Sequence, residues 1–580
     1  MPRLRPLIRT RPSRRARLRG VAGGVLVLLG GLAAAGFGGA LQAAPPALPD
    51  TAPVTPAPLI APSATVTPAP LLAAPAPLGP VVTLGPDDLF LNPLTGRLTL
   101  AAAALPPPAN ALPSLAADDE SPAARYLRHI VVTGQAAGLA GVVYDNRDRG
   151  HSLLPPALFP ALTRTAYAPE LRKQGADFGP AGAFRLPAIT FGNSSTAITS
   201  GPAPRSLPRL LMTSAGTPWQ AWADYSSNAL YVYPCHRDHD AWDMYPAAWP
   251  YLLVSQGSSG SDQPFLRAVA MILAAFPPDT RARLQAEGLV APTVQMVFRR
   301  AQAGVTGPAD YMSGAANPSV FARSAIDLQA MVALANSLVP QAIPPLVRLT
   351  VEAEDFQPRA GLLGGPEKLF DTPSAIARLW RGPAYEHQMV VTTAGTADPN
   401  GRPLTFHWVL LRGDPDRVRI APLDATGSRA RISLTWQDPR PAPAGPTVQG
   451  PGPMSARIDI GVFADNGASL SAPAFVSVSL PAQQIRRYAP GPDGAMRLAE
   501  VDYDANGRSA PYDPLLWWSA PWRDLFHYDA AGRLAGWTRV STRPDGPAPE
   551  DFAADGTTGG RQPGYALKKP GADLAQTRTE

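Results

Sequence analysis

The stretch "WPYLLVSQGSSGSDQPFLRAVAMILAAF", residues 249–276, places an apolar run, a glycine- and serine-rich loop and a second apolar run in succession. The first run predicts a buried strand, because short apolar runs that stop at polar loops are typical of strands in a sheet. Asp262 and Pro264 favour a helix start at the second run, and Pro277 and Pro278 end it. A strand followed by a helix indicates a mixed α/β or α+β domain.

Similar segments lie on both sides of this stretch. Four earlier apolar runs also stop at polar loops and predict strands: "LAGVVYDNRDRGHS" (139–152), "LPAITFGNSST" (186–196), "LPRLLMTSAG" (207–216) and "ALYVYPCHRDHD" (229–240). Three later segments predict helices: "TRARLQAE" (280–287), "PTVQMVFRRAQ" (292–302) and "RSAIDLQAMVALANSLV" (323–339). We therefore expect a mixed α/β domain over residues 123–340. The connections between its strands are short for full crossover helices, so parallel and antiparallel pairing both stay open.

Residues 341–482 predict an all-β sandwich, because alternating apolar residues are separated by Asp, Asn and Gly turns. Within it, "AGTADPNGRPLTFHW" (394–408) and "VFADNGASLSAPAFVSVSL" (462–480) resemble the PKD family of immunoglobulin-like domains over about residues 386–482. The matching residues are Asp398, Pro399, Gly401, Trp408, Asp465 and Gly467. The resemblance implies a spacer or binding module without catalytic residues, in which Trp408 is core and Asp398 binds turn amides. Residues 356–386 depart from the family as a long insertion.

The two ends of the chain differ in composition from these domains. Residues 1–43 carry eight arginines and no acid before an uncharged apolar run, which predicts an export signal or a single-span membrane anchor. Residues 44–122, rich in proline and alanine, predict a disordered spacer with one small hairpin at 81–100. Residues 483–540 predict a small β-hairpin extension, and residues 541–580 predict a disordered tail.

This organisation predicts an exported chain in the periplasm or on the cell surface, attached to the inner membrane through its N-terminal segment. A single cysteine, Cys235, excludes an internal disulfide framework. Eight of the 51 basic residues lie in the first 43 residues, which leaves 43 against 45 acidic residues. This balance argues against nucleic acid as a partner.

Histidines and aspartates gather in two loops that follow predicted strands. Loops after strands are where α/β domains place their sites, and His and Asp side chains suit zinc or a similar ion. The predicted metal ligands are Asp145, His151, His236 and His239, and the predicted catalytic carboxylates are Asp148, Asp238 and Asp240. One carboxylate would act as general base on a metal-bound water. In the alternative interpretation, Arg147, Arg149 and Arg237 pair with these aspartates in a salt-bridged network.

The loop before the helix at residue 264 is a second candidate site. Free amides at a helix start, together with the hydroxyls of Ser258, Ser259 and Ser261, suit an anionic ligand. Alternatively, Gly257 and Gly260 only form a tight turn there, and Ser261 or Asp262 caps the helix. Nine aromatic residues between 219 and 251 suit either a stacking platform for sugar rings or core packing.

Two functions follow from the sequence. The first is a non-catalytic binding or structural protein of a bacterial cell envelope, with a cell-wall glycan or an envelope protein as partner. The second is an envelope metal-dependent hydrolase that uses the two His/Asp loops. The sequence identifies no cofactor beyond this metal.

Overall fold

The structure is a computed structural model that describes residues 78–92, 97–101, 104–108, 111–147, 152–173, 184–194, 216–235, 250–258, 260–447, 450, 452–505, 518–567 and 573–577. Within these residues, no helix is both long enough and apolar enough to cross a membrane. The described residues therefore give no support for the predicted membrane attachment. Residues 1–43, in which the signal peptide is predicted, lie outside the described residues, which give no support for that signal. The location in the periplasm or on the cell surface stays a prediction.

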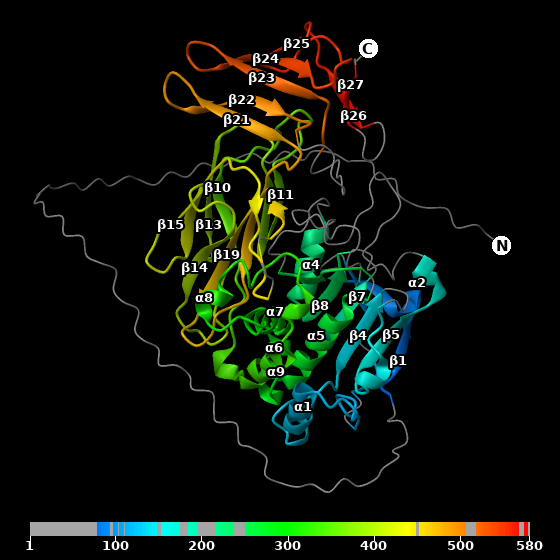
Figure 1. The fold of residues 1–580 in the computed structure, drawn as a ribbon. Coiled ribbons are helices and arrows are strands. Elements are labelled where there is room, and N and C mark those ends of the chain that lie inside the picture. The colour runs from blue at the N-terminus through cyan, green and yellow to red at the C-terminus, as the bar shows by residue number, and fades with distance from the viewer. Residues whose placement is uncertain are drawn as a thin grey trace, which may run out of the picture. The chain divides into compact units, whose positions relative to one another are not determined.

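Six strands form the central sheet of the α/β part (Figure 1). In spatial order they are β1 (Val81–Leu84), β5 (Thr163–Tyr167), β4 (Val142–Arg147), β7 (Ile189–Ser194), β8 (Ala229–Pro234) and β9 (Leu252–Ser255). Every neighbouring pair is parallel. All residues of β8 and β9 are buried, as expected of a sheet covered on both faces. The predicted mixed α/β class is therefore observed, with the parallel strand direction that the sequence left open.

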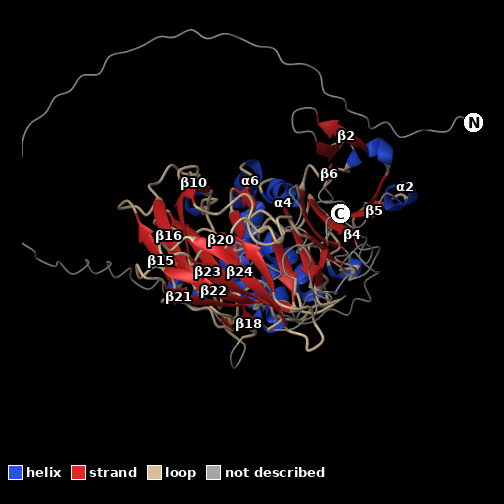
Figure 2. Ribbon diagram, turned by 90° about the horizontal axis from the view of Figure 1, so that it is seen from above, coloured by secondary structure: helices blue, strands red, loops and turns tan. Residues whose placement is uncertain are grey.

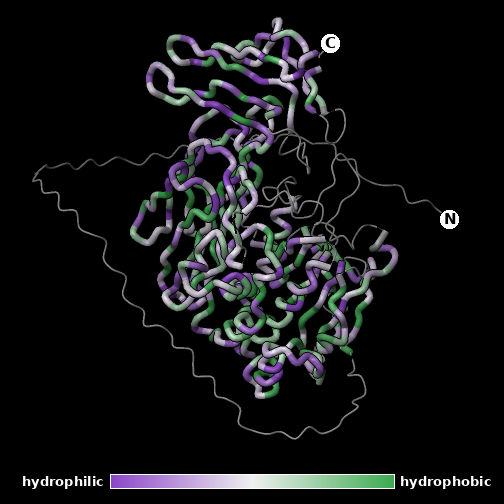
Figure 3. The backbone as a smooth tube through the Cα atoms, viewed as in Figure 1, coloured by the Kyte–Doolittle hydropathy of each residue, from purple (hydrophilic) through white to green (hydrophobic). Residues whose placement is uncertain are grey.

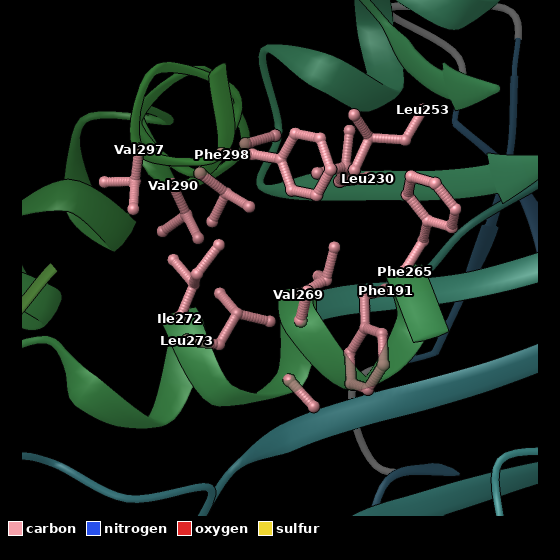
Figure 4. Packing of buried hydrophobic residues seen from close by; sticks show 14 of the residues in the cluster. Phe191, Leu230, Leu253, Phe265, Val269, Ile272, Leu273, Val290, Val297 and Phe298 are labelled. Carbon is pink, nitrogen blue, oxygen red and sulfur yellow. The ribbon is translucent and has the colours of Figure 1, made fainter. Parts of the chain in front are cut away.

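The four helices predicted after residue 262 are observed as α5 (Gln263–Ala275), α6 (Pro278–Ala286), α7 (Val290–Arg300) and α9 (Leu328–Ser337). α5 packs on β7, and α7 packs on α5 and β8. Figure 4 shows apolar side chains of the strands meeting those of the two helices: Phe191, Leu230, Leu253, Phe265, Val269 and Phe298. The described residues of this part also form α1 (Pro122–Val132), α2 (Pro169–Lys173), α4 (Thr217–Tyr225) and α8 (Pro308–Tyr311). Figure 3 shows hydrophobic and hydrophilic residues alternating along the backbone of the described residues.

Two β-sheets without helices follow, as predicted (Figure 2). The first has β10 (Thr350–Glu354), β13 (Glu386–Thr392), β16 (Arg429–Thr435) and β15 (Val418–Pro422), in this order. The second has β11 (Lys368–Thr372), β12 (Ala375–Leu379), β20 (Ala474–Ser479), β19 (Arg457–Asp465) and β14 (Thr405–Arg412). Residues from both sheets share one buried hydrophobic core, which includes Met389, Ile432, Ile458 and Val476. A short ladder of β17 (Arg440–Pro441) and β18 (Met454–Ser455) completes this part.

The sandwich differs from the expected pattern in the stretch predicted to be an insertion. Residues 356–386 supply β11 and β12, and β12 pairs in parallel with β20, so this stretch is part of the sheet. Trp380, from the same stretch, is fully buried, whereas Trp408 is only half-buried. The prediction for Asp398 is confirmed, because its carboxylate accepts hydrogen bonds from the amides of Asn400 and Arg402.

Both ends of the chain contain more strands than the composition predicted. Within the predicted spacer, β2 (Leu89–Asn92) and β3 (Arg97–Leu100) form the expected hairpin, but β1 joins the parallel sheet and β3 also pairs with β6 (Phe184–Arg185). The predicted small hairpin is a five-stranded sheet of β21 (Ile485–Pro490), β22 (Met496–Asp502), β23 (Trp522–Tyr528), β24 (Leu534–Ser541) and β25 (Glu550–Ala553). The predicted disordered tail contributes β25 and the pair β26 (Gly564–Leu567) and β27 (Leu574–Thr577).

Candidate functional site

The parallel strand direction brings the ends of β4, β7, β8 and β9 to one edge of the sheet. From β4 the chain adds β5 on one side, and it then adds β7 on the other side of β4. The strand order therefore reverses between β4 and β7, and such a switch point is where open α/β sheets bind their ligands. β4 ends at this point in three polar residues, Asp145, Asn146 and Arg147.

Asp145 is fully buried and accepts four side-chain hydrogen bonds from three strands. Its Oδ2 accepts from Arg147 Nε and from the Tyr231 hydroxyl, each at 2.6 Å. Its Oδ1 accepts from Thr165 Oγ1 at 2.7 Å and from the Tyr167 hydroxyl at 2.5 Å. A carboxylate has about four acceptor positions, so these donors occupy all of them. In this arrangement the Asp145 carboxylate binds protein donors only, and its predicted role as a metal ligand stays a prediction.

The charges of this cluster follow from its burial and its contacts. Burial raises the pKa of Asp145, but Arg147 and the three hydroxyls lower it, and the net pKa lies below its usual range. Burial lowers the pKa of Arg147, but Asp145 raises it well above its usual value. Burial raises the pKa values of Tyr167 and Tyr231, so both hydroxyls remain donors at neutral pH. The cluster is therefore a buried ion pair held by neutral phenols, and the Arg147 guanidinium lies 5.1 Å from the centre of the Tyr231 ring.

Gly192 allows β7 to lie between the two halves of this cluster. It pairs with Asp145 on β4 and with Tyr231 on β8. A Cβ at Gly192 would lie 1.9 Å from the carbonyl oxygen of Asp145, which no side chain permits. Because Gly192 has no side chain, β7 can lie this close to β4 at the switch point.

A second polar cluster involves the alternate residues of β4. The Tyr144 hydroxyl donates to Asn193 Oδ1 at 3.0 Å, and it accepts from the amide of Leu154 at 3.0 Å and from Asn146 Nδ2 at 3.2 Å. Burial raises the pKa of Tyr144 to about 12. Asp262, fully buried at the start of α5, contributes to the same rise. These bonds attach the segment after residue 151 to the ends of β4 and β7.

The serine-rich loop lies against the ends of β8 and β4. Cys235 is buried, and its sulfur lies 3.3 Å from the amide nitrogen and 3.4 Å from the carbonyl oxygen of Gly257. The amide of Gly260 donates to Ser152 Oγ at 2.7 Å, so the loops after β4 and β9 meet. Ser261 Oγ lies 2.9 Å from Ser255 Oγ. This is the tight turn of the alternative interpretation, except that Asp262 makes no side-chain cap hydrogen bond.

Most residues of the predicted metal site lie outside the described residues. These are Asp148, His151, His236, Asp238, His239 and Asp240. In the described part of the chain, no group of three His, Cys, Asp or Glu residues is arranged to hold a metal ion. The metal site therefore stays a prediction. Of the predicted anion ligands, Ser258 is exposed and Ser261 half-buried, and Ser259 lies outside the described residues.

Sequence reasoning recognised Arg147 as an ion-pair partner, and its bond to Asp145 confirms that alternative for this pair. It missed Thr165, Tyr167 and the role of Tyr231. The sequence did contain one indication of the ion pair. Asp145 and Arg147 are two residues apart in a strand, so their side chains lie on the same face of the sheet. The strand that carries Thr165 and Tyr167, "TRTAY", was not predicted.

Comparisons with known proteins show no family for this chain. No family model matches, and no curated protein matches. Among solved structures, a nucleoside hydrolase-related hypothetical protein from Saccharophagus degradans is 11% identical, with a TM-score of 0.17 over 58% of this chain and 99% of that one. An endo-fucoidan hydrolase of glycoside hydrolase family 107 is 8% identical, with a TM-score of 0.15 over 66% of this chain and 79% of that one. At these TM-scores neither match carries an argument. The resemblance of residues 386–482 to the PKD family is not confirmed, and the structure shows a β-sandwich there.

Proposed function

We propose that this chain binds a small polar substrate at the carboxyl edge of its parallel sheet, between β4 and β7, and hydrolyses it. The strand order carries the proposal, because it places the switch point beside Asp145 and Arg147. A buried ion pair is costly to desolvate and is not needed to form a parallel sheet. Buried groups with shifted pKa values gather at functional sites more often than elsewhere.

The residues proposed to carry out the chemistry follow directly after the described strand ends. The chain leaves β4 at Arg147 and β8 at Pro234, and both ends lie at the same edge of the sheet. The proposed metal ligands are His151, His236 and His239, and the proposed bases are Asp148, Asp238 and Asp240. A divalent ion there would lower the pKa of a bound water, and one carboxylate would accept its proton. Asp145 would hold Arg147 and Tyr231 in place beside the substrate.

Metal content of the full-length chain tests this proposal. We expect plasma mass spectrometry to find close to one metal ion per chain, and the double variant His236→Ala, His239→Ala to lose it. The double variant His407→Ala, His527→Ala removes two histidines on β14 and β23 and is the matched control, which should keep the metal. Hydrolysis of nitrophenyl esters, phosphates and glycosides is measured on the same samples. Absence of metal from the parent chain, with no hydrolysis of any of the three classes, would exclude the proposal.

A non-catalytic binding function is the second candidate, and one observation favours it. The polar groups described at this edge already satisfy one another: Asp145 accepts four hydrogen bonds, and Ser255 and Ser261 contact each other. None of these groups is a free nucleophile or base. A ligand that binds the parent chain and the His236→Ala, His239→Ala variant equally, without turnover, would favour this function over hydrolysis.

A further inference from the structure

A cleft of about 390 Å³ lies between the sandwich and the sheet of β21–β25. This volume is within the range of about 300–1,000 Å³ that is typical of small-molecule sites. Tyr385 and Trp436 line it from the segments before β13 and after β16, and Tyr488 lines it from β21. None of the residues that line the cleft belongs to the candidate site at the parallel sheet.

Aromatic rings form one wall of the cleft. The ring centres of Tyr385 and Tyr488 are 5.1 Å apart, and those of Trp436 and Tyr488 are 5.9 Å apart. The guanidinium of Arg486 lies 4.4 Å from the centre of the Trp436 ring and holds it in place. Trp436 is buried, whereas Tyr385 and Tyr488 are half-buried. The two tyrosine rings are therefore the aromatic surface that a ligand could cover.

Two buried donors at this wall have no hydrogen-bond partner among the described residues. They are Nε1 of Trp436 and Nε2 of Gln437, whose residues are 7% and 4% exposed. The backbone amide of Asp414 donates to Gln437 Oε1 at 2.7 Å. This bond orients the Gln437 side chain, and its NH₂ group has no acceptor among the described residues. A buried donor without a partner costs about 1–3 kcal/mol. The next residue, Asp438, adds an exposed carboxylate to the lining.

We propose that this cleft binds a saccharide. A sugar ring has an apolar face that packs on tyrosine rings, and it has hydroxyl groups that both accept and donate hydrogen bonds. After a small rotation of the Trp436 and Gln437 side chains that turns their N–H groups toward the cleft, its hydroxyls would accept from both, and they would donate to Asp438. A proline-rich peptide would also suit the aromatic wall, but proline has no N–H to offer the Asp438 carboxylate. The saccharide uses all three groups, and for this reason we favour it.

Affinity electrophoresis of the full-length chain tests the proposal. Native gels contain hydroxyethyl cellulose, xylan, laminarin or glycol chitin, and retardation in at least one of them is expected. Trp436→Phe removes the indole donor, and Gln437→Glu keeps the acceptor for Asp414 while it removes the NH₂ group. Each variant should weaken binding by about tenfold, the value of one hydrogen bond of about 1.4 kcal/mol. Trp537→Phe is the matched control, since Trp537 Nε1 on β24 is also buried without a described partner.

Three results would overturn the proposal: no retardation by any of the four polysaccharides, retardation that Trp436→Phe and Gln437→Glu leave unchanged, or equal weakening by Trp537→Phe. Binding of a polyproline peptide at Trp436 without binding of any polysaccharide would assign the cleft to proline-rich segments instead. The His236→Ala, His239→Ala variant should be retarded like the parent chain. This separates failure of the saccharide site from failure of the hydrolase proposal.

Discussion

Asp145 shows how one buried charge is accommodated in an apolar sheet. Each ion of a buried pair loses several kcal/mol of hydration, and only good geometry and further hydrogen bonds offset this loss. Here Arg147 neutralises the charge, and Thr165, Tyr167 and Tyr231 satisfy the remaining acceptor positions. Because the donors come from β4, β5 and β8, the carboxylate also fixes the relative positions of these strands at the switch point.

The lowered pKa of Asp145 predicts how stability depends on pH. Its pKa is lower in the folded chain than the value of about 3.9 in an unfolded chain, so the carboxylate contributes stability above pH 3.9 and loses it as the pH falls toward the folded value. We expect Asp145→Asn to reduce the slope of unfolding free energy against pH below about pH 4, by up to ~1.4 kcal/mol per pH unit. Urea titrations between pH 2 and pH 5 measure this slope.

The variant Asp145→Asn also tests the effect of the charge, because asparagine has nearly the same shape as aspartate but no charge. At neutral pH, Asp145→Asn leaves Arg147 buried without its counter-ion, and a loss of about 3–5 kcal/mol is expected. Asp118→Asn, at an exposed position before α1, is the control and should change neither the slope nor the stability. A slope for Asp145→Asn equal to that of the parent chain would show that this carboxylate does not contribute.

At the scale of elements, the contact between β4 and β7 depends on one glycine. The variant Gly192→Ala would place a Cβ 1.9 Å from the Asp145 carbonyl oxygen, so the strands must separate or twist apart. We expect the unfolding free energy to fall by about 1–3 kcal/mol, as for other overpacked cores. Gly216→Ala, before α4, is the matched control, because nothing lies within 4 Å of a Cβ there. Equal stabilities of the two variants would contradict the close approach.

Elements with strong apolar patterns were predictable from sequence, whereas their pairing was not. β8, β9 and α5 are nearly all buried, and their continuous apolar runs were recognised. β5, "TRTAY", was missed because its polar residues are buried by long-range bonds to Asp145, which no local pattern reveals. β12 lies in the stretch predicted to be an insertion, because its parallel partner β20 lies about 100 residues away in the chain and no local pattern indicates the pairing. β1 lies within the predicted hairpin at 81–100, but it pairs in parallel with β5 instead of joining that hairpin.

For the candidate site, the sequence indicated the polar residues that follow the ends of β4 and β8. It did not indicate the hydrogen-bonded cluster around Asp145 that connects β4, β5 and β8. Asp145, Gly192 and Tyr231 lie side by side on β4, β7 and β8 because of the strand register. A single sequence does not specify this register when it leaves parallel and antiparallel pairing open. The cleft at Trp436 was not predicted either, because its walls come from the sandwich and from β21.

At the scale of the described chain, the α/β part and the sandwich share one hydrophobic cluster. Residues of β11, β12 and β19 belong to the same core as α5 and α7. The Tyr251 hydroxyl contacts Thr372 Oγ1 at 2.8 Å and accepts from the amide of Ser374 at 3.1 Å. The Tyr311 hydroxyl donates to the carbonyl oxygen of Ser471 at 2.7 Å. Polar bonds of this kind, inside a continuous apolar contact, couple the two parts energetically.

We therefore expect the α/β part and the sandwich to unfold in one cooperative transition. Tyr251→Phe leaves the buried amide of Ser374 without its acceptor, so it should lower the unfolding free energy by about 1–3 kcal/mol and shift the whole transition. Helix content by far-ultraviolet circular dichroism and amide hydrogen exchange of the sandwich strand β16 should change together, because most of the described helices lie in the α/β part and β16 lies in the sandwich. Tyr126→Phe, at an exposed position of α1, is the control. If Tyr251→Phe shifted only the helical signal, the two parts would be independent domains, and the shared core would not couple them.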